Sequence, residues 1–394
     1  MITYKRLFAG LASIVAMLTV GAGAASAQDY KLGLLTSMSG TLAPAGKQVR
    51  WGTEFAVDEI NAKGGILGRK IAITLEDDES NPQVAARKAE RLYQDVKVDF
   101  ITGTIHSGGT LAVGQLAERE KKPMATTVSY SSNITGSQCN PYMFRVNAHA
   151  GIQAAAMVTW LAKNVKGERY VILGPDYEMG RNAADLFSAE VKRNGKTVVE
   201  TIFPPLGATD FSTYFGRIRA ARPDVLLTMT PGNDTVRLLT QMKEFGLIPA
   251  SFKLGGAAGA VTAGNIGAIG DAAEGFITGA SYSADLDTPA NKAFAPRFKA
   301  KYGEDPDLFA VDSYSLVYLI KAAAEKAGSL DAEALRKAIP GTSWDTPQGR
   351  KSMRKEDNQA SLNMYIIEVK GKDFKIVGTV PAAEIKIPNE CNKF

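Results

Sequence analysis

Residues 32–76 constrain the fold more than any other stretch, because they have the order of a strand–helix–strand unit. The expected elements are a strand at 32–35, a polar loop at 36–44, a helix at about 48–62, a glycine turn at 64–65 and a strand at 70–75. Four apolar residues are spaced to share one buried face of the helix: Trp51, Phe55, Val57 and Ile60. This connection fits a right-handed crossover between parallel strands and predicts a doubly wound sheet. Ligands bind beyond the carboxyl ends of the strands in such sheets, where the loop at 37–42 would lie.

Strand and helix patterns alternate along nearly all of the chain, which is long enough for two cores. The chain crosses between the cores three times, near residues 146, 280 and 345. We therefore predict an α/β fold of two doubly wound, Rossmann-like lobes joined by a three-strand hinge. The first lobe is expected to hold residues 28–146 and 280–345, and the second residues 147–279 and 346–394.

Residues 1–27 are typical of a cleavable signal peptide. Lys5 and Arg6 precede an apolar run at 7–20, and the small residues 25–27 form a cleavage site. We expect an exported, soluble protein in the periplasm of a Gram-negative bacterium. Without Lys5 and Arg6 the chain has 44 basic residues (46 less 2) against 41 acidic ones, a net charge of +3. That balance argues against nucleic-acid binding.

Only two cysteines are present, Cys139 and Cys391. In an exported chain, one structural disulfide between them is the leading prediction. Two free thiols stay possible, because the sequence does not give the distance that a disulfide requires. With only two histidines beside them, the spacing argues against a zinc site, and we expect no metal and no cofactor.

Several motifs resemble the leucine/isoleucine/valine-type solute-binding proteins of bacterial ABC importers, a periplasmic binding protein family of type I topology. They are Ser39-Gly40 followed by Gly46, the run at 58–68, Glu76-Asp77-Asp78 before Asn81-Pro82, and Thr346-Pro347 followed by Gly349. The resemblance extends over nearly the whole chain after residue 27. It implies a receptor, expected to be monomeric, that closes around a small molecule and delivers it to a membrane permease.

The resemblance also implies where the ligand lies. The turn at 105–108 matches the place where the family binds a carboxylate, with Ser107 and backbone N–H groups at a helix start as donors. Ser129 or Tyr130 adds donors, while His106 is either a protonated partner or only a group that shapes the turn. The full expected set of ligand-binding residues is Ala45, Ile105, His106, Ser107, Ser129, Tyr130, Tyr177, Met179, Pro231, Gly256 and Phe309.

One departure from the family pattern bears on the ligand. Amino-acid binders of this family typically hold the ammonium with an acidic residue where this chain has Gly256. A buried ammonium without a carboxylate is strongly unfavourable, so we predict an aromatic or other hydrophobic carboxylic acid. Asp234 or Glu178 could serve an ammonium if the register differs by a few residues, which keeps branched-chain or other amino acids as the alternative.

Two further readings belong to other classes of protein. A ligand-sensing module for a signalling receptor would use the same fold. An amidohydrolase-like enzyme would need an activated serine, yet adjacent side chains such as His106 and Ser107 point apart on a turn, and no G-x-S-x-G motif surrounds Ser107. We therefore expect no catalytic residues.

Overall fold

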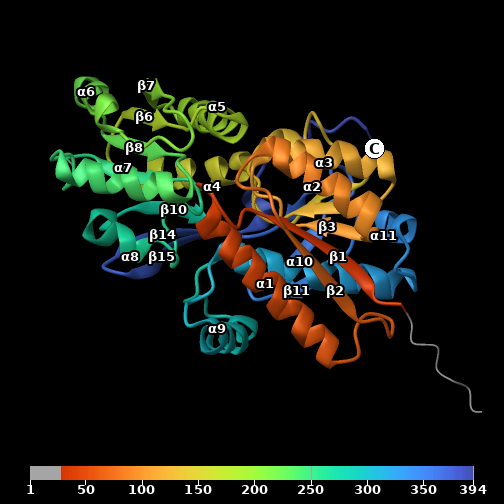
Figure 1. Ribbon diagram of the computed structural model, residues 1–394. Helices are drawn as coiled ribbons and strands as arrows, with labels where there is room; N and C mark the ends of the chain where they lie inside the picture. Colours follow the sequence, from red (N-terminus) through yellow and green to blue (C-terminus); the bar gives the residue numbers. More distant parts are fainter. Residues whose placement is uncertain (1–27, 250, 394) are drawn as a thin grey trace, which may run out of the picture.

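The computed structural model describes residues 28–249 and 251–393. They form two α/β lobes side by side, with the helices α5, α6 and α7 of the second lobe at the left of Figure 1 and α2, α3 and α11 of the first at the right. The sequence prediction of two doubly wound, Rossmann-like lobes is confirmed. The signal peptide predicted at 1–27 lies outside the described residues.

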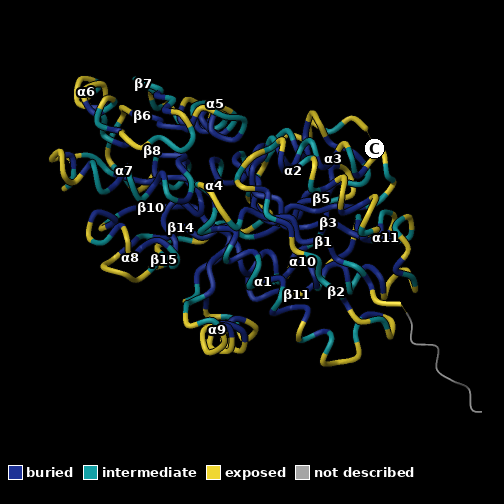
Figure 2. The backbone as a smooth tube through the Cα atoms, viewed as in Figure 1, coloured by how far each residue is buried: buried dark blue, intermediate teal, exposed yellow. Residues whose placement is uncertain are grey.

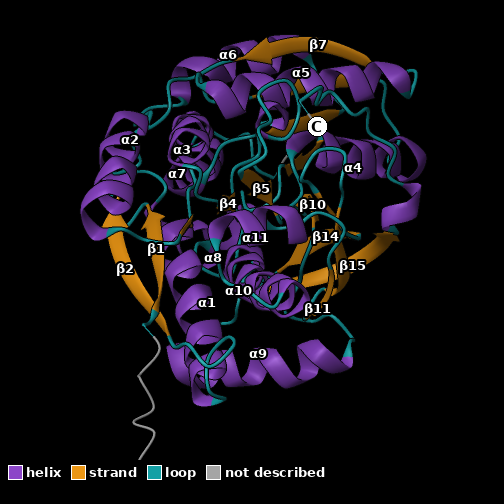
Figure 3. Ribbon diagram, turned by 90° about the vertical axis from the view of Figure 1, so that its right-hand side faces the viewer, coloured by secondary structure: helices purple, strands orange, loops and turns teal. Residues whose placement is uncertain are grey.

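The first lobe is built on a parallel sheet of five strands. Its order is β2 (Ile71–Asp77), β1 (Tyr30–Thr36), β3 (Phe100–Thr102), β4 (Met124–Thr126) and β5 (Met143–Arg145). One face carries α2 (Pro82–Arg91) and α3 (Ser107–Glu120), and the other α1 (Ala43–Ala62) and α10 (Leu308–Ala327) (Figure 3). Helices α9 (Pro289–Tyr302) and α11 (Ala332–Ala338) flank α10 in the sequence.

The second lobe is built on a mixed sheet of seven strands. Its order is β15 (Asp373–Val380), β14 (Met364–Lys370), β10 (Ile277–Ala280), β9 (Lys253–Gly256), β8 (Val225–Thr228), β6 (Arg169–Leu173) and β7 (Thr197–Ile202). Strand β14 runs antiparallel to β10 and β15, while the other pairs are parallel. The helices are α4 (Ala150–Asn164), α5 (Glu178–Arg193), α6 (Ser212–Ala221), α7 (Gly232–Glu244) and α8 (Ile266–Ile269).

Local sequence sets the helix that opens the first lobe. Pro44 stands in the first turn of α1, where its missing N–H costs nothing, so the helix begins five residues before the predicted start at 48. Further along, α1 packs against α10 at Gly52, where a Cβ atom would lie 2.0 Å from the carbonyl oxygen of Ala310. Glycine therefore allows the close contact of these two helices. The inner strands of both lobes are buried, whereas the edge strands β7 and β15 are mostly half-buried or exposed, and many exposed residues lie on the outer helices (Figure 2).

The chain crosses between the lobes at residues 146–149, 281–288 and 362–363, and the tail after β15 returns to the first lobe. The third lies later than the predicted position near 345. Strands β11 (Ser343–Thr346), β12 (Gly349–Met353) and β13 (Ala360–Ser361) form a small antiparallel sheet. Trp344 and Met353 pack into the first-lobe core, and Gln359 pairs with Arg145. Because a hairpin keeps its strands together, residues 346–361 stay with the first lobe, contrary to the predicted boundary.

The predicted disulfide between Cys139 and Cys391 is present, with the Cα atoms 5.7 Å apart. After β15 the chain leaves the second lobe, and Ile385 and Ile387 pack on the first-lobe core before the disulfide fixes the tail there. The segment predicted as part of the second lobe, 346–394, thus contributes only β14 and β15 to the second sheet.

Candidate functional site

A small enclosed space of about 40 Å³, here called the inner cavity, lies between the lobes. Leu42, Ala45 and Phe309 belong to its first-lobe wall, and Met179, Met229 and Ala258 to its second-lobe wall. None of the described residues in this wall is an Asp, Glu, Lys, Arg or His. The wall is apolar apart from a few hydroxyl and amide groups.

Seven residues of the predicted site lie in the wall of the inner cavity: Ala45, Ile105, Tyr130, Tyr177, Met179, Pro231 and Phe309. Each stands beside the carboxyl end of a strand or in the first turn of a helix, as the doubly wound fold requires. The other four, His106, Ser107, Ser129 and Gly256, do not line the inner cavity.

The two serines hold the loops of the first lobe. Ser107 Oγ accepts a hydrogen bond from the N–H of Ser131 at 3.3 Å. Ser129 Oγ donates to the carbonyl oxygen of Ile105 at 2.8 Å and pairs with the hydroxyl of Thr110. Both residues are fully buried. In this closed form, their hydroxyl groups bind the protein itself and fix the loops on which Ile105 and Tyr130 stand.

His106 caps the N-terminus of α3, where its Nδ1 accepts the N–H of Gly109 at 3.4 Å. Its ring lies 4.7 Å from that of Tyr177, measured between centroids. Burial lowers the pKa of His106 to about 4, although the charge of Glu178 acts in the opposite direction. The imidazole is therefore neutral at pH 7 and shapes the turn as an acceptor, so the protonated form considered from the sequence does not describe this state.

Gly256 ends β9 and is enclosed by the sheet. A Cβ atom at this position would lie 2.3 Å from the carbonyl oxygen of Thr228 and 2.9 Å from the ring of Phe276. The glycine therefore leaves no free space for a ligand ring. Ala257 and Ala258, the next residues, form the wall instead, so the predicted register was off by one or two positions.

Tyr130 has the most informative polar group in the wall. Its side chain is 7% exposed, and its hydroxyl has no hydrogen-bond partner among the described residues. Burial raises the pKa of Tyr130 well above its usual value, and the charges of Asp312 and Asp307 act in the same direction. A buried hydroxyl without a partner costs about 1–3 kcal/mol, which a ligand atom can recover.

Five long helices point their N-termini at the inner cavity. Its wall contains residues from the first turns of α1, α7 and α10, the cap of α5, and Ile105 just before α3. Free N–H groups and the helix dipole make such ends attractive to anions. The first turns of α1 and α3 hold no acidic residue, so their effect is not offset.

The acidic residues nearest these helix ends are bound elsewhere. Glu178 accepts from Ser131 and Asn133, and Asp234 accepts the N–H of Gly207 and pairs with Arg237. Asp307 caps α10 by accepting the N–H groups of Phe309 and Ala310. Burial raises the pKa of Asp234 to about 6 and that of Asp307 to about 7, so Asp307 is only partly ionised at neutral pH.

Hydrogen bonds join the lobes on either side of the cavity. On one side, Glu178 and Asn182 of α5 bind Ser131, Ser132 and Asn133, with donor–acceptor distances of 2.7–3.1 Å; these five residues are called the latch. On the other side, the N–H of Asn233 donates to the carbonyl oxygen of Thr41 at 3.2 Å. The structure is thus the closed form of a two-lobed clamp.

Sequence reasoning missed several members of the wall, including Met229, Thr230 and Asn265, and included Leu42 only within the loop at 37–42. A signal was available for two of them. Met229 and Thr230 follow the buried strand β8 directly and precede Pro231, which was predicted. Asn265 comes from the Gly/Ala-rich stretch after β9, where periodicity is too weak to predict which side chains face inward.

The described residues contain no group of three or more His, Cys, Asp or Glu that could hold a metal ion. Within 28–249 and 251–393, no helix is long and apolar enough to span a bilayer.

The fold agrees with that of known proteins. Residues 29–374 match the family model described as periplasmic binding protein, and the chain belongs to that family. Its members are binding proteins of transporters and not enzymes. The chain is 30% identical to the Leu/Ile/Val-binding protein BraC3 of Rhizobium johnstonii, covering 79% of this chain and 83% of the relative. It is 28% identical to the Leu/Ile/Val-binding protein homolog 4 of Brucella melitensis, covering 93% and 90%.

Solved structures narrow the class. A solute-binding protein of an ABC transporter from Rhodopseudomonas palustris BisB5, in complex with 3,4-dihydroxybenzoic acid, has a TM-score of 0.85 and 28% identity and covers 92% of this chain and 99% of its own. A second R. palustris solute-binding protein, in complex with benzoate, has a TM-score of 0.83 and 27% identity, with coverages of 89% and 96%. The protein is a solute-binding protein of an ABC transporter.

Proposed function

We propose that the protein is a periplasmic receptor that binds a small aromatic carboxylate in the inner cavity for uptake. One observation carries the proposal: five helix N-termini converge on a wall in which none of the described residues is charged. Such a site favours an anion with an apolar body. The two R. palustris relatives are in complex with benzoate and a hydroxylated benzoate, which supports the same class.

The interactions that the site offers are strong enough to bind a carboxylate. Taking it out of water costs several kcal/mol. A helix N-terminus contributes about 0.3–1 kcal/mol, and a hydrogen bond to a charged group about 1.5–3 kcal/mol. The Tyr130 hydroxyl offers such a bond, and the N-termini of α1 and α3 add their dipoles. Together with burial of a ring against Phe309 and Met179, they make the roughly 8 kcal/mol of micromolar binding attainable.

An amino acid is the second candidate, because the relatives from Rhizobium and Brucella are named for leucine, isoleucine and valine. An ammonium group needs a carboxylate partner, yet no Asp or Glu is among the described residues that line the inner cavity. Glu178 is occupied in the latch and Asp234 by Arg237. The uncharged wall therefore favours an acid without an α-amino group.

Binding requires the lobes or the wall side chains to move. A volume of about 40 Å³ is close to that of one or two waters, and ligand sites typically measure about 300–1,000 Å³. Met179 and Met229 can rearrange to admit a ring. Ligand contacts to both lobes then favour closure, and the closed form is what a membrane permease recognises in this proposal.

Tyr130→Phe tests the proposal by isothermal titration calorimetry with benzoate, 4-hydroxybenzoate and leucine. We expect the wild type to bind an aromatic acid more tightly than leucine. The variant should lose about 1.5–3 kcal/mol of that binding if the hydroxyl meets the carboxylate, a ten- to hundredfold weaker affinity.

Tyr30→Phe is the matched control. The Tyr30 hydroxyl is also buried and unpaired within the described chain, but Tyr30 begins β1 and so lies at the end of this strand away from the inner cavity. Its affinities should equal those of the wild type. Tighter binding of leucine than of every acid would refute the proposed ligand class.

A further inference from the structure

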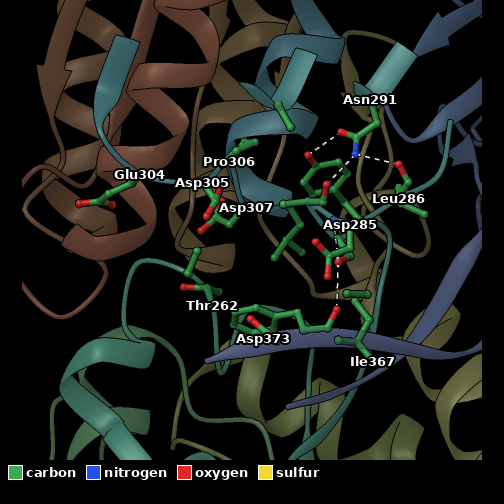
Figure 4. Close-up of a pocket in the computed structure, with 18 of the residues that line it drawn as sticks. Thr262, Asp285, Leu286, Asn291, Glu304, Asp305, Pro306, Asp307, Ile367 and Asp373 are labelled. Carbon is green, nitrogen blue, oxygen red and sulfur yellow. Dashed lines mark hydrogen bonds between the residues drawn. The ribbon is translucent and has the colours of Figure 1, made fainter. Parts of the chain in front are cut away.

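A much larger cavity of about 1,020 Å³, here called the outer chamber, adjoins the inner cavity. Its wall comes from both lobes and from the crossing segment 281–288. Thr262 and Ile367 belong to the second lobe, while Glu304, Asp305 and Asp307 lie on the first-lobe loop before α10 (Figure 4). Because both lobes contribute, an occupant of this chamber would also be held by closure.

Only a thin partition separates the two cavities. Gly259 and Thr262 line both of them. The ring of Phe309 lies against Gly259 so closely that a Cβ atom there would be 2.2 Å from Phe309 Cζ. Leu308 faces the outer chamber and Phe309 the inner cavity, one residue apart. Rotation of the Phe309 side chain would therefore join the two spaces.

Asp307 is the distinctive polar group on the chamber side. Both N–H groups that it caps bind Oδ1, at 2.8 and 3.1 Å, and Oδ2 has no hydrogen bond among the described residues. The other carboxylates of this wall pair with lysines: Glu304 with Lys47, Asp305 with Lys299, Asp287 with Lys292, and Asp285 and Asp373 with Lys375. Asp307 makes no ion pair within the described part of the chain.

A second unpaired group lies in the same wall. The hydroxyl of Thr278 on β10 has no hydrogen-bond partner among residues 28–249 and 251–393, and its side chain is 2% exposed. Tyr282 and Phe374 add aromatic surface to the wall. The wall of the outer chamber thus combines apolar and aromatic surface and several lysine–carboxylate pairs with one carboxylate oxygen, Asp307 Oδ2, that has no partner among the described residues. That oxygen suits a ligand group that donates a hydrogen bond.

We propose that the outer chamber binds the distal end of an extended aromatic acid, whose ring lies past Phe309 and whose far end donates a hydrogen bond to Asp307. The carboxylate of this ligand stays at the inner cavity, so the inference rests on the proposed function. The preferred ligands are longer than benzoate and carry a hydroxyl or amine opposite the acid group.

Calorimetry with benzoate, 3-phenylpropanoate and 3-(4-hydroxyphenyl)propanoate tests the inference. The wild type should bind the hydroxylated acid at least fivefold more tightly than 3-phenylpropanoate. In Asp307→Asn the ratio of the two affinities, hydroxylated acid to 3-phenylpropanoate, should fall to about one. Asparagine is as good a helix cap as aspartate, so the variant keeps α10. Asp305→Asn is the matched control, since Asp305 lies in the same wall but pairs with Lys299, and its ratio should stay at the wild-type value.

Phe309→Ala provides a second measurement by removing the partition. It should shift the affinity ratio of 3-phenylpropanoate to benzoate in favour of the longer acid. Two results would show that the outer chamber is not a ligand site while the proposed function stands. Either the wild type binds benzoate but does not prefer the hydroxylated acid over 3-phenylpropanoate, or Asp307→Asn keeps that preference. If no aromatic acid binds, the proposed function fails together with this inference.

Discussion

His106 illustrates how burial decides the role of a single residue. In the sequence it stands beside a serine at a helix start, where a cation would suit an anionic ligand. In the structure it is 7% exposed, and loss of water lowers its pKa to about 4. The neutral ring then serves as an acceptor for the N–H of Gly109 and as a neighbour of Tyr177.

This burial predicts a pH dependence that belongs to His106. Between pH 6.5 and about 4 the unfolded chain binds a proton at this residue and the folded chain does not, so stability is lost as the pH falls. The shift corresponds to roughly 3 kcal/mol. Urea unfolding at pH 7.5 and pH 4.5 measures this effect. The free energy of unfolding should fall between the two pH values in both proteins, and the fall should be about 2–3 kcal/mol smaller in His106→Gln than in the wild type. Parallel losses in the two proteins would contradict a buried neutral histidine.

Single residues also show where sequence reasoning ended. The family resemblance and the rule that ligands lie beyond the strands together pointed to Tyr130, Tyr177 and Pro231, which line the inner cavity. It could not separate Gly256 from Ala257 or Ala258, since consecutive residues after a strand point in different directions and the choice depends on contacts with Thr228 and Phe276. Nor could it tell that Ser107 binds the backbone of Ser131.

At the scale of elements, the latch connects the start of α5 to the loop before β5. Glu178 Oε1 accepts from Ser131 Oγ at 2.7 Å and from Asn133 Nδ2 at 2.9 Å. Asn182, one turn later, accepts the N–H of Ser132 with its Oδ1 and donates from its Nδ2 to Ser132 Oγ. Since these bonds join the two lobes, they stabilise the closed form whether or not a ligand is present.

Glu178→Gln should therefore weaken closure. Bonds to a charged acceptor are worth about 1.5–3 kcal/mol, and the amide keeps part of that value. We expect the dissociation rate of a bound aromatic acid to rise about 3–30-fold in stopped-flow experiments, with a smaller effect on the association rate. Asp185→Asn is the control, because Asp185 is exposed on the same helix. Equal dissociation rates in Glu178→Gln and the wild type would exclude the latch from ligand retention.

The sequence predicted secondary-structure elements better than it predicted the contacts of single residues. The alternation of strand and helix predicted both sheets, because each depends on local periodicity and parallel crossovers. The small sheet of β11, β12 and β13 was missed. Its strands are short, and their place in the first lobe depends on distant contacts, such as the one between Gln359 and Arg145. The third crossing was consequently placed too early.

At the scale of the whole molecule, a buried ion pair lies beside the first two crossing segments. Lys351 Nζ contacts Asp312 Oδ1 at 2.5 Å and donates to the carbonyl oxygen of Val146 in the first crossing at 3.1 Å. Asp312 also accepts from Gln348 at 3.0 Å and from Ser281 of the second crossing at 3.4 Å. Tyr365, just after the third crossing, donates to the carbonyl oxygen of Gln348 at 3.3 Å.

This network ties the hinge to the ligand site through α10. Phe309 lines the inner cavity and Asp312 lies one turn further along the same helix. Burial raises the pKa of Asp312 and lowers that of Lys351, while their mutual attraction opposes both shifts. A displacement of α10 would therefore act on the first and second crossing segments, through Val146 and Ser281.

Removing only Asp312 from the pair should lower the stability of the protein. Removing both Asp312 and Lys351 should restore most of that stability but still weaken closure of the lobes. Asp312→Asn leaves a buried ammonium without its carboxylate and should lower the free energy of unfolding by about 3–5 kcal/mol in urea. The double variant Asp312→Leu with Lys351→Met replaces the pair by apolar groups of similar size and should recover most of that stability. Because it no longer binds Val146 or Ser281, its small-angle scattering without ligand should show a larger radius of gyration than the wild type. It should also need a higher ligand concentration to close. If the double variant is as compact as the wild type and binds ligand equally well, the pair serves only the stability of the first lobe, and hinge closure is set elsewhere.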